Sequence, residues 1–215
     1  MNPPRPLCST AELSALLAVV SLALVISGIG PKDVMTWLLE VLPVLIVAPV
    51  LILTRRRFPL TRLCYWFITL HALILILGGH YTYAEVPLGF WLQDVFDLSR
   101  NPYDRIGHIA QGFVPALVTR EILLRQTPLR RGGWLFMLVV SVCLAFSAFY
   151  EMIEWWVAVI AGISAEAFLG TQGDIWDTQW DMFLALLGAI TAQLAFSRVQ
   201  DRQLGAMGIE PGPGA

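Results

Sequence analysis

Apolar residues occur along this chain in six windows of about 20 residues, separated by charged residues, prolines and glycines. A helix needs roughly 20 mostly apolar residues to cross the hydrocarbon core of a bilayer. The pattern therefore predicts an all-α membrane protein, a bundle of about six transmembrane helices with short loops, forming a single polytopic domain over residues 1–205. Residues 206–215 are expected to be a disordered tail. The predicted spans are 11–29, 34–53, 63–80, 104–124, 134–156 and 178–197.

Two further apolar stretches do not fit a complete span. Residues 157–170 continue the fifth window past Trp155 and Trp156, a pair typical of the aromatic belt at a membrane interface. We expect residues 157–170 to form an interfacial or re-entrant segment over the outer face. The stretch 88–92, where aromatic and aliphatic residues precede Asp94, is expected to lie at the same interface.

The composition agrees with a membrane protein and excludes an ordinary soluble domain. Apolar residues make up 57% of the chain and charged residues 14%, against about 25% charged residues in soluble domains, and the mean hydropathy is +0.67. The net charge of −2, without a basic stripe, gives no support for a nucleic-acid partner. Cys8, Cys64 and Cys143 are far apart, in or near apolar runs, so they predict neither a disulfide framework nor a CxxC metal site.

Positive residues are concentrated in alternate loops, which predicts the orientation of the chain, because arginine and lysine are retained on the cytoplasmic side during insertion. The segments after the second and fourth spans hold eight arginines, whereas the opposite loops offer three positive residues. We therefore expect both arginine-rich segments and both termini to be cytoplasmic, and the loops at 81–101 and 164–177 to face outward. The eight arginines are Arg55, Arg56, Arg57, Arg62, Arg120, Arg125, Arg130 and Arg131.

Ionisable side chains gather toward the outward ends of the fourth, fifth and sixth spans. A charge inside a bilayer costs roughly 2.5–3.5 kcal/mol on insertion scales, so each such residue is a functional candidate. They come in pairs three or four positions apart, which places both members on one face of a helix. Antiparallel neighbouring helices would bring these faces together near the outer interface. The pairs are Asp104 with His108, Glu151 with Glu154, and Asp177 with Asp181.

This combination of carboxylates and imidazole suits three kinds of chemistry. It could hold one divalent metal ion through oxygen and nitrogen ligands, transfer protons, or pair with Arg105. Arg105, Trp155 and Trp176 are candidates for binding a substrate, for example a lipid headgroup. The candidate catalytic residues are Asp104, His108, Glu151, Glu154 and Asp181, and the candidate metal ligands are Asp104, His108, Glu151, Glu154, Asp177 and Asp181.

Structural roles compete with these functional ones. Pro102 is typical of a helix start, and the segment before the sixth span has a similar pattern, so Asp104, Asp174 and Asp177 could act as helix caps alone. Capping cannot explain the four ionisable residues that lie deeper in the spans. Their structural alternative is a polar network that clamps the helices together. The tryptophans could be belt or packing residues.

Three multi-residue motifs, in order along the chain, are similar to those of a known family. On these motifs the chain resembles the uncharacterised bacterial inner-membrane family typified by YjdF, over most of its length. The resemblance implies a six-helix protein of the bacterial inner membrane and brings no established activity. The motifs lie at 101–121 (NPYDRIGH, then QGFVPA and TRE), 150–156 (YEMIEWW) and 173–181 (GDIWDTQWD).

The order of the acidic motifs is also similar, more distantly, to the VanZ-like group, named for a protein linked to glycopeptide-antibiotic tolerance. VanZ-like proteins typically carry Asn midway through the last motif, where this chain has Ala185, so a role of that amide does not transfer. The resemblance points to a cell-envelope context more firmly than to a reaction. The matching residues are Asp104, Arg105 and His108, then Glu151 and Glu154, then Asp181 and Gly188.

Three functions of different classes fit these features. The first is an envelope enzyme or accessory protein whose outer-face pocket acts on a lipid-linked or amphipathic substrate. The second is a proton-coupled transporter, and the third is a structural membrane protein whose polar cluster only holds the helices together. Membrane lipids are the expected partners in each case. The sequence carries no G-x-S-x-G, H-E-x-x-H or phosphate-binding glycine loop that would indicate a particular reaction.

Overall fold

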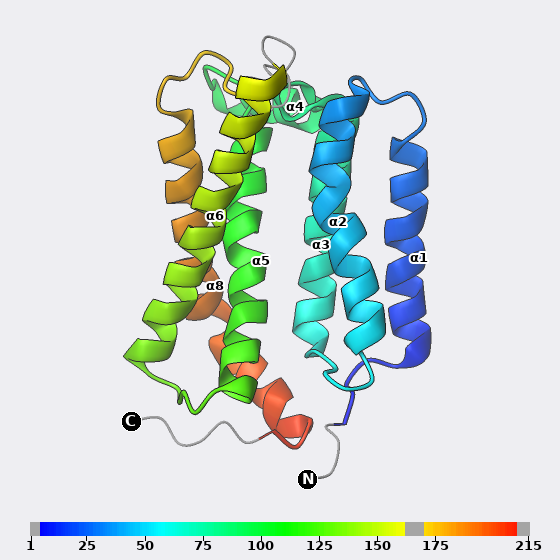
Figure 1. Cartoon of the computed structure of the whole chain (residues 1–215), viewed down its shortest axis with the longest axis vertical. Helices are drawn as coiled ribbons and strands as arrows, with labels where there is room; N and C mark the ends of the chain where they lie inside the picture. The colour runs from blue at the N-terminus through cyan, green and yellow to red at the C-terminus, as the bar shows by residue number, and fades with distance from the viewer. Residues whose placement is uncertain (1–4, 162–169, 210–215) are drawn as a thin grey trace.

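A computed structural model describes residues 5–161 and 170–209, and all regular secondary structure within these residues is helical (Figure 1). Six long helices run along one axis with alternating direction, which confirms the predicted fold class. The elements are α1 (Thr10–Ser27), α2 (Val34–Thr54), α3 (Arg62–Tyr81), the 3-10 turn η1 (Tyr83–Glu85), α4 (Pro87–Phe96), α5 (Tyr103–Gln126), α6 (Gly133–Ala161) and α8 (Asp177–Ala206).

Five of the long helices, α1, α2, α3, α6 and α8, are long and apolar enough to cross a bilayer, judged by length and composition. Their outward positions carry large apolar side chains, such as Leu53 on α2 and Leu194 on α8, which are 79% and 73% exposed. Contact of so much apolar surface with water is unfavourable, whereas contact with lipid chains is not. The exposed surface of the bundle is therefore suited to a membrane.

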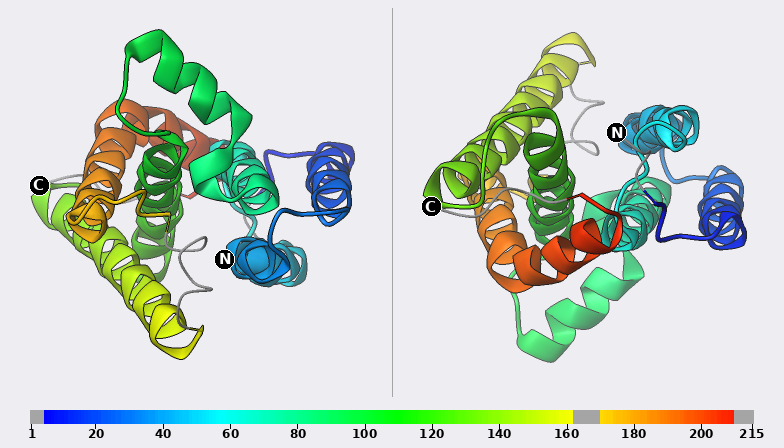
Figure 2. Two further views of the ribbon diagram at one scale, coloured as in Figure 1. Left: turned by 90° about the horizontal axis from the view of Figure 1, so that it is seen from above. Right: turned by 90° about the horizontal axis from the view of Figure 1, so that it is seen from below.

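The sixth long helix, α5, differs because it lies inside the bundle, against α3, α6 and α8 (Figure 2). It is 24 residues long, and twelve of its residues are buried, including Asp104, His108, Arg120 and Glu121. Because of these polar residues, α5 is less apolar than the other five long helices and is not counted among the spans judged by composition. Its charges contact protein groups instead of lipid, which is how ionisable residues are accommodated at membrane depth.

Helices α5 and α8 approach each other until their backbones touch. A Cβ atom added to Gly112 of α5 would overlap the carbonyl oxygen of Ala185 on α8, and one added to Gly188 of α8 would overlap the carbonyl oxygen of Ile109 on α5. Small residues permit such close contact between helices in membrane bundles. The two glycines thus fix the register of α5 against α8, and with it the relative position of the polar residues at their ends.

The short helix α4 lies across one end of the bundle, nearly perpendicular to the long helices (Figure 2). It contains residues 88–92, and its orientation is compatible with the interfacial position predicted for them. Pro87 lies in its first turn, where a proline fits without loss of a helical hydrogen bond. Phe90 and Trp91 are exposed on it, and exposed aromatic side chains of this kind are typical of residues at a membrane interface.

The two C-terminal helices run further than predicted. α6 remains helical through Ala161, so residues 157–161 continue the helix and do not form a separate interfacial or re-entrant segment, which corrects that part of the prediction. The remainder of the predicted interfacial segment, 162–169, lies outside the described residues. The physical reason is that the aromatic pair does not interrupt helical hydrogen bonding, so the helix continues past the belt.

Helix α8 extends to Ala206, and Met207 after it is only 1% exposed, so these two residues do not belong to the tail predicted to begin at residue 206. Residues 210–215 of that predicted tail lie outside the described residues. The extension is held by the bundle, because the side-chain amide of Gln200 donates a hydrogen bond to the carbonyl oxygen of Leu117 (2.7 Å). The N–H of Arg5 donates to the carbonyl oxygen of Met207 (3.1 Å). Both ends of the described chain therefore meet at the end of the bundle opposite α4 (Figure 1).

We expect reporter fusions to place this arginine-rich end in the cytoplasm. A reporter after Arg57 or Arg131 should be cytoplasmic, and one near Asp97 or Thr171 should be external, because positive residues are held back during insertion. Paired fusions to alkaline phosphatase, active outside, and green fluorescent protein, fluorescent inside, measure each position with opposite signals. An external reporter at Arg131 would contradict the predicted orientation.

Candidate functional site

Neither α5 nor α8 has a side-chain hydrogen bond at its N-cap, and the local turns before them are formed by residues other than Asp104 and Asp177. The side-chain oxygens of Asn101 and Asp174 each accept a hydrogen bond from the backbone N–H two residues further along, at 3.0 and 2.9 Å. Side-chain acceptors of this kind stabilise helix starts. The carboxylates of Asp104 and Asp177 contact other side chains instead, so capping alone does not account for them.

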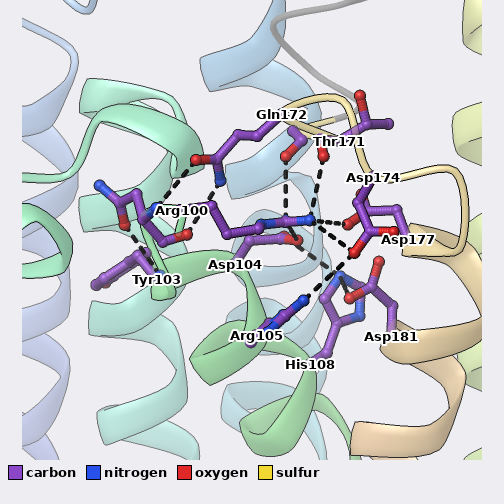
Figure 3. A network of polar contacts seen from close by, with 12 residues as sticks. Arg100, Tyr103, Asp104, Arg105, His108, Thr171, Gln172, Asp174, Asp177 and Asp181 are labelled. Carbon is purple, nitrogen blue, oxygen red and sulfur yellow. Dashed lines mark hydrogen bonds and ion pairs between the residues drawn. The ribbon is translucent and has the colours of Figure 1, made fainter. Parts of the chain in front are cut away.

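His108 belongs to a buried cluster formed by α5, α6 and α8. Figure 3 shows it on α5, beside Asp104 of the same helix and Asp181 of α8. Its Nε2 atom is 3.4 Å from Asp104 Oδ1 and 3.7 Å from Asp181 Oδ1. Its Nδ1 atom is 3.0 Å from Gln111 Oε1 and 3.9 Å from Glu151 Oε1. The structure therefore brings together candidate residues from all three helices, at the end of the bundle where α4 lies.

Two overlapping groups in this cluster have the arrangement of metal ligands. One is Asp104, His108 and Asp181, and the other is His108, Glu151 and Glu154; within each group one ligand atom from every residue lies within 4.8 Å of the others. All five residues are buried, with exposed fractions from 2% for Asp181 to 9% for Glu154. Oxygen and imidazole donors of this kind bind divalent cations such as Zn²⁺, Mn²⁺ or Fe²⁺.

Two carboxylate oxygens that face His108 are left without a hydrogen-bond donor. Asp181 Oδ1 and Glu151 Oε1 are buried and unpartnered within the described part of the chain. Burying a polar atom without a partner costs roughly 1–3 kcal/mol, and more for a charged group. A cation bound beside either oxygen would offset that cost for it. The residues present thus fit a divalent metal ion in both chemistry and burial.

Arg100, one of the three positive residues in the loops predicted to face outward, lies at the edge of this cluster and faces its carboxylates. Its guanidinium is 2.5 Å from Asp177 Oδ1, 3.4 Å from Asp104 Oδ2 and 3.5 Å from Asp174 Oδ2 (Figure 3). Arg100 is only 9% exposed. Asp177, a predicted metal ligand, is paired with this arginine and belongs to neither ligand group.

The predicted substrate-binding residues lie outside the buried cluster. Arg105, whose side chain is 36% exposed, is 3.3 Å from Asp174 and lies 5.5 Å from the ring centre of Trp180. Trp176 and Trp180 line an open hollow of about 390 Å³ on α8. Trp155, 61% exposed on α6, has the position of a belt residue. The structure thus places Arg105 and Trp176 around one aromatic surface.

Glu40 is a buried acid that the sequence analysis missed. It lies on α2, is 4% exposed, and its Oε2 atom accepts a hydrogen bond from the hydroxyl of Tyr150 (3.4 Å). Tyr150 directly precedes Glu151 on α6, so this contact ties α2 to the helix that carries two candidate ligands. Glu40 could have been identified from the sequence, because it is the only charged residue in the window 34–53.

A second buried polar network lies at the arginine-rich end, and its side chains pair with one another as expected of residues that only hold helices together. Glu121 is fully buried, accepts hydrogen bonds from the N–H and hydroxyl of Thr61 (3.1 and 2.8 Å) and pairs with Arg125 (2.7 Å). Arg120 donates to Gln200 (3.0 Å) in the same network. The carboxylate of Glu121 is fully satisfied, in contrast to the unpartnered oxygens around His108.

Taken together, the fold and the lipid-compatible surface define an integral, multi-pass α-helical membrane protein with a buried acidic and histidine cluster at one end. Residues 12–202 match the family described as "Predicted membrane protein (DUF2238)", and the chain belongs to this family. It is 52% identical over 200 residues to the inner membrane protein YjdF of Escherichia coli strain K12, covering 93% of this chain and 96% of that protein. No solved structure matches the chain.

Family membership confirms the first resemblance seen in the sequence and the assignment to the inner membrane. It brings no reaction with it. The likeness to the VanZ-like group remains a resemblance of motifs. A function therefore has to be argued from the site itself.

Proposed function

We propose that this protein is an envelope enzyme or accessory protein that acts on a lipid-linked or amphipathic substrate, and that the cluster around His108 binds one divalent metal ion for this function. The observation that carries the proposal is the pair of buried, unpartnered oxygens, Asp181 Oδ1 and Glu151 Oε1, on two sides of one imidazole. A network selected only to clamp helices would satisfy these atoms, as the network around Glu121 does.

The residues around His108 divide into ligands and positioning groups. Asp104, His108 and Asp181 form one ligand group, on the Nε2 side of the imidazole, and would hold the ion. Glu151 and Glu154 form the other group with His108, and Glu151 lies on the Nδ1 side; this pair would act as acid and base. When bound, the ion would supply a Lewis acid for a substrate oxygen or a water molecule. Arg100 neutralises the remaining carboxylates at the edge of the cluster and holds the 170–177 segment against α5.

The surface next to the cluster supports a lipid-like substrate. Arg105 is partly exposed beside Trp180, and the hollow lined by Trp176, Trp180 and Phe183 lies on the same helix end. A guanidinium binds phosphate through several hydrogen bonds, and aromatic rings suit the interfacial region of a bilayer. Arg105 would therefore hold an anionic headgroup, with the apolar part of the substrate against the aromatic surface.

A proton-coupled transporter is less well supported, because neither α5 nor α8 continues the cluster with ionisable residues toward the other end. On α5 no ionisable residue lies between His108 and Arg120, a distance of roughly 18 Å at 1.5 Å per helical residue. On α8 none lies between Asp181 and Arg198. Proton relays in membrane proteins use closer chains of titratable groups.

Metal analysis of gently purified protein tests the proposal. We expect about one divalent ion per wild-type chain, and at least a tenfold lower metal content in the variants Asp181→Asn and His108→Gln. Their apparent melting temperatures should stay close to wild type. Each replacement keeps most of the side-chain volume and hydrogen-bonding capacity but loses the ligand charge or the imidazole. Elemental analysis and detergent melting curves measure both quantities, and lipid mass spectrometry on the same samples identifies a co-purified substrate.

The matched control is Asp201→Asn, on the same helix but at the arginine-rich end, where Asp201 pairs with Arg120. It should retain the metal. Wild-type protein that neither contains a divalent ion nor takes one up on titration would refute the metal site. If the variants lose the ion only when they also lose their cooperative melting transition, the result would favour the alternative in which the polar cluster only holds the helices together.

A further inference from the structure

A second cavity lies at the arginine-rich end of the bundle, and it shares no residue with the cluster around His108. Its volume is about 200 Å³, and it is formed by the segment before α1, the first turns of α1, the turn between α2 and α3, and the start of α3. The wall is mixed in character, with apolar and aromatic side chains facing two guanidinium groups. Among the lining residues are Pro6, Cys8, Leu13, Arg55, Arg56 and Tyr65.

The turn that forms one wall of this cavity is held in place by buried residues. Arg125 donates a hydrogen bond to the carbonyl oxygen of Pro59 (2.7 Å), and its guanidinium lies 3.5 Å from the ring centre of Phe58. The N–H of Leu60 donates to the hydroxyl of Tyr65 (3.3 Å). A wall fixed by such contacts is ordered before a ligand arrives, which lowers the entropic cost of binding.

The cavity carries positive charge that the protein leaves without an internal partner. The nearby carboxylates Glu12, Glu121 and Asp201 pair with Arg62, Arg125 and Arg120, at 2.6, 2.7 and 2.9 Å. Arg55 and Arg56 form no ion pair within the described residues, since every pair found there involves other residues. Burial raises the pKa of the Cys8 thiol to about 11, so at neutral pH the thiol adds no negative charge.

We infer that this cavity binds the phosphate group of an anionic glycerophospholipid, with Arg55 and Arg56 as the phosphate ligands. Basic pockets between transmembrane helices on the cytoplasmic side are suited to such headgroups. A lipid fits better than free phosphate because Pro6 and Leu13 offer an apolar wall to the glycerol part. The neighbouring surface of α2, where Leu53 is 79% exposed, is suited to the acyl chains. The inference stands independently of the metal site.

Native mass spectrometry of delipidated protein in mild detergent tests this site, with titration of dioleoylphosphatidylglycerol, dioleoylphosphatidylcholine and inorganic phosphate. We expect one phosphatidylglycerol to bind selectively over phosphatidylcholine. The double variant Arg55→Gln/Arg56→Gln should bind it about 25-fold more weakly, because each arginine near a headgroup contributes roughly a fivefold effect. Millimolar inorganic phosphate should not displace the lipid.

The matched control is Arg57→Gln/Arg130→Gln, which removes the same charge from the same end at two exposed arginines outside the cavity. It should weaken binding less than threefold. Equal weakening in both double variants would overturn the site in favour of general surface attraction, and displacement by inorganic phosphate would overturn the lipid assignment. If the Arg55→Gln/Arg56→Gln variant fails to fold, wild-type selectivity decides, because equal binding of the two lipids would refute the inference.

Discussion

Replacing Gly112 by leucine should destabilise the bundle by about 3 kcal/mol or more, one of the two largest effects that we expect from a single substitution. The new side chain has no space, because even its Cβ atom would overlap the carbonyl oxygen of Ala185, and backbone cannot give way as a flexible side chain does. Separation of α5 from α8 should also move His108 away from Asp181. Unfolding in mixed detergent micelles measures the change.

Gly205→Ala is the control for the Gly112 prediction. Gly205 lies near the end of α8, and nothing lies within 4 Å of a Cβ atom built on it. The alanine should be neutral or stabilise α8 by up to about 1 kcal/mol through its higher helix propensity. A Gly112→Leu variant as stable as wild type would show that α5 and α8 are not in backbone contact.

Arg100→Met should cost about 3–5 kcal/mol, the effect of removing one partner from a buried ion pair. The methionine preserves much of the side-chain volume, but it leaves Asp104 and Asp177 buried without their cation. Arg105→Met is the matched control, because Arg105 is 36% exposed and forms one ion pair among the described residues, with Asp174; it should cost less than about 1 kcal/mol. Chemical denaturation of the two variants compares them directly.

A second substitution distinguishes loss of charge balance from loss of packing. Combining Arg100→Met with Asp177→Asn should recover part of the lost stability, because one of the two uncompensated charges is then absent. No recovery in the double variant would mean that Arg100 acts mainly by filling space, and the electrostatic account of this edge of the cluster would be wrong.

The sequence predicted the parts of the site that depend on helical spacing. Asp104 with His108, and Glu151 with Glu154, are three or four residues apart on helices that the sequence predicts as membrane spans, so their shared face and their common depth follow from helix geometry alone. Their convergence on one histidine followed from the cost of exposing carboxylates to lipid. The structure contains this convergence, with His108 between α6 and α8.

Other members of the site depend on tertiary contacts that no local pattern encodes. Arg100 precedes α5 in a connection, and only the fold shows that it turns inward to reach Asp177, 77 positions further along the chain. Glu40 could have been found, because it is the single charge in an otherwise apolar span. The end of α8 could not, since Gln200 and Met207 are held by packing against the rest of the bundle.

The polarity of α5 has a consequence for how the chain is made. A helix with this many charged residues partitions poorly into lipid by itself, and its main packing partner, α8, is completed about 80 residues after α5 ends. At 5–20 residues per second, synthesis of that stretch takes roughly 4–16 s. At the start of this interval only α1 to α4 and the insertion machinery can contact α5, and α6 is completed about 35 residues after α5 ends. The order of synthesis therefore makes the polar face of α5 dependent on other protein contacts until α6 and then α8 are complete.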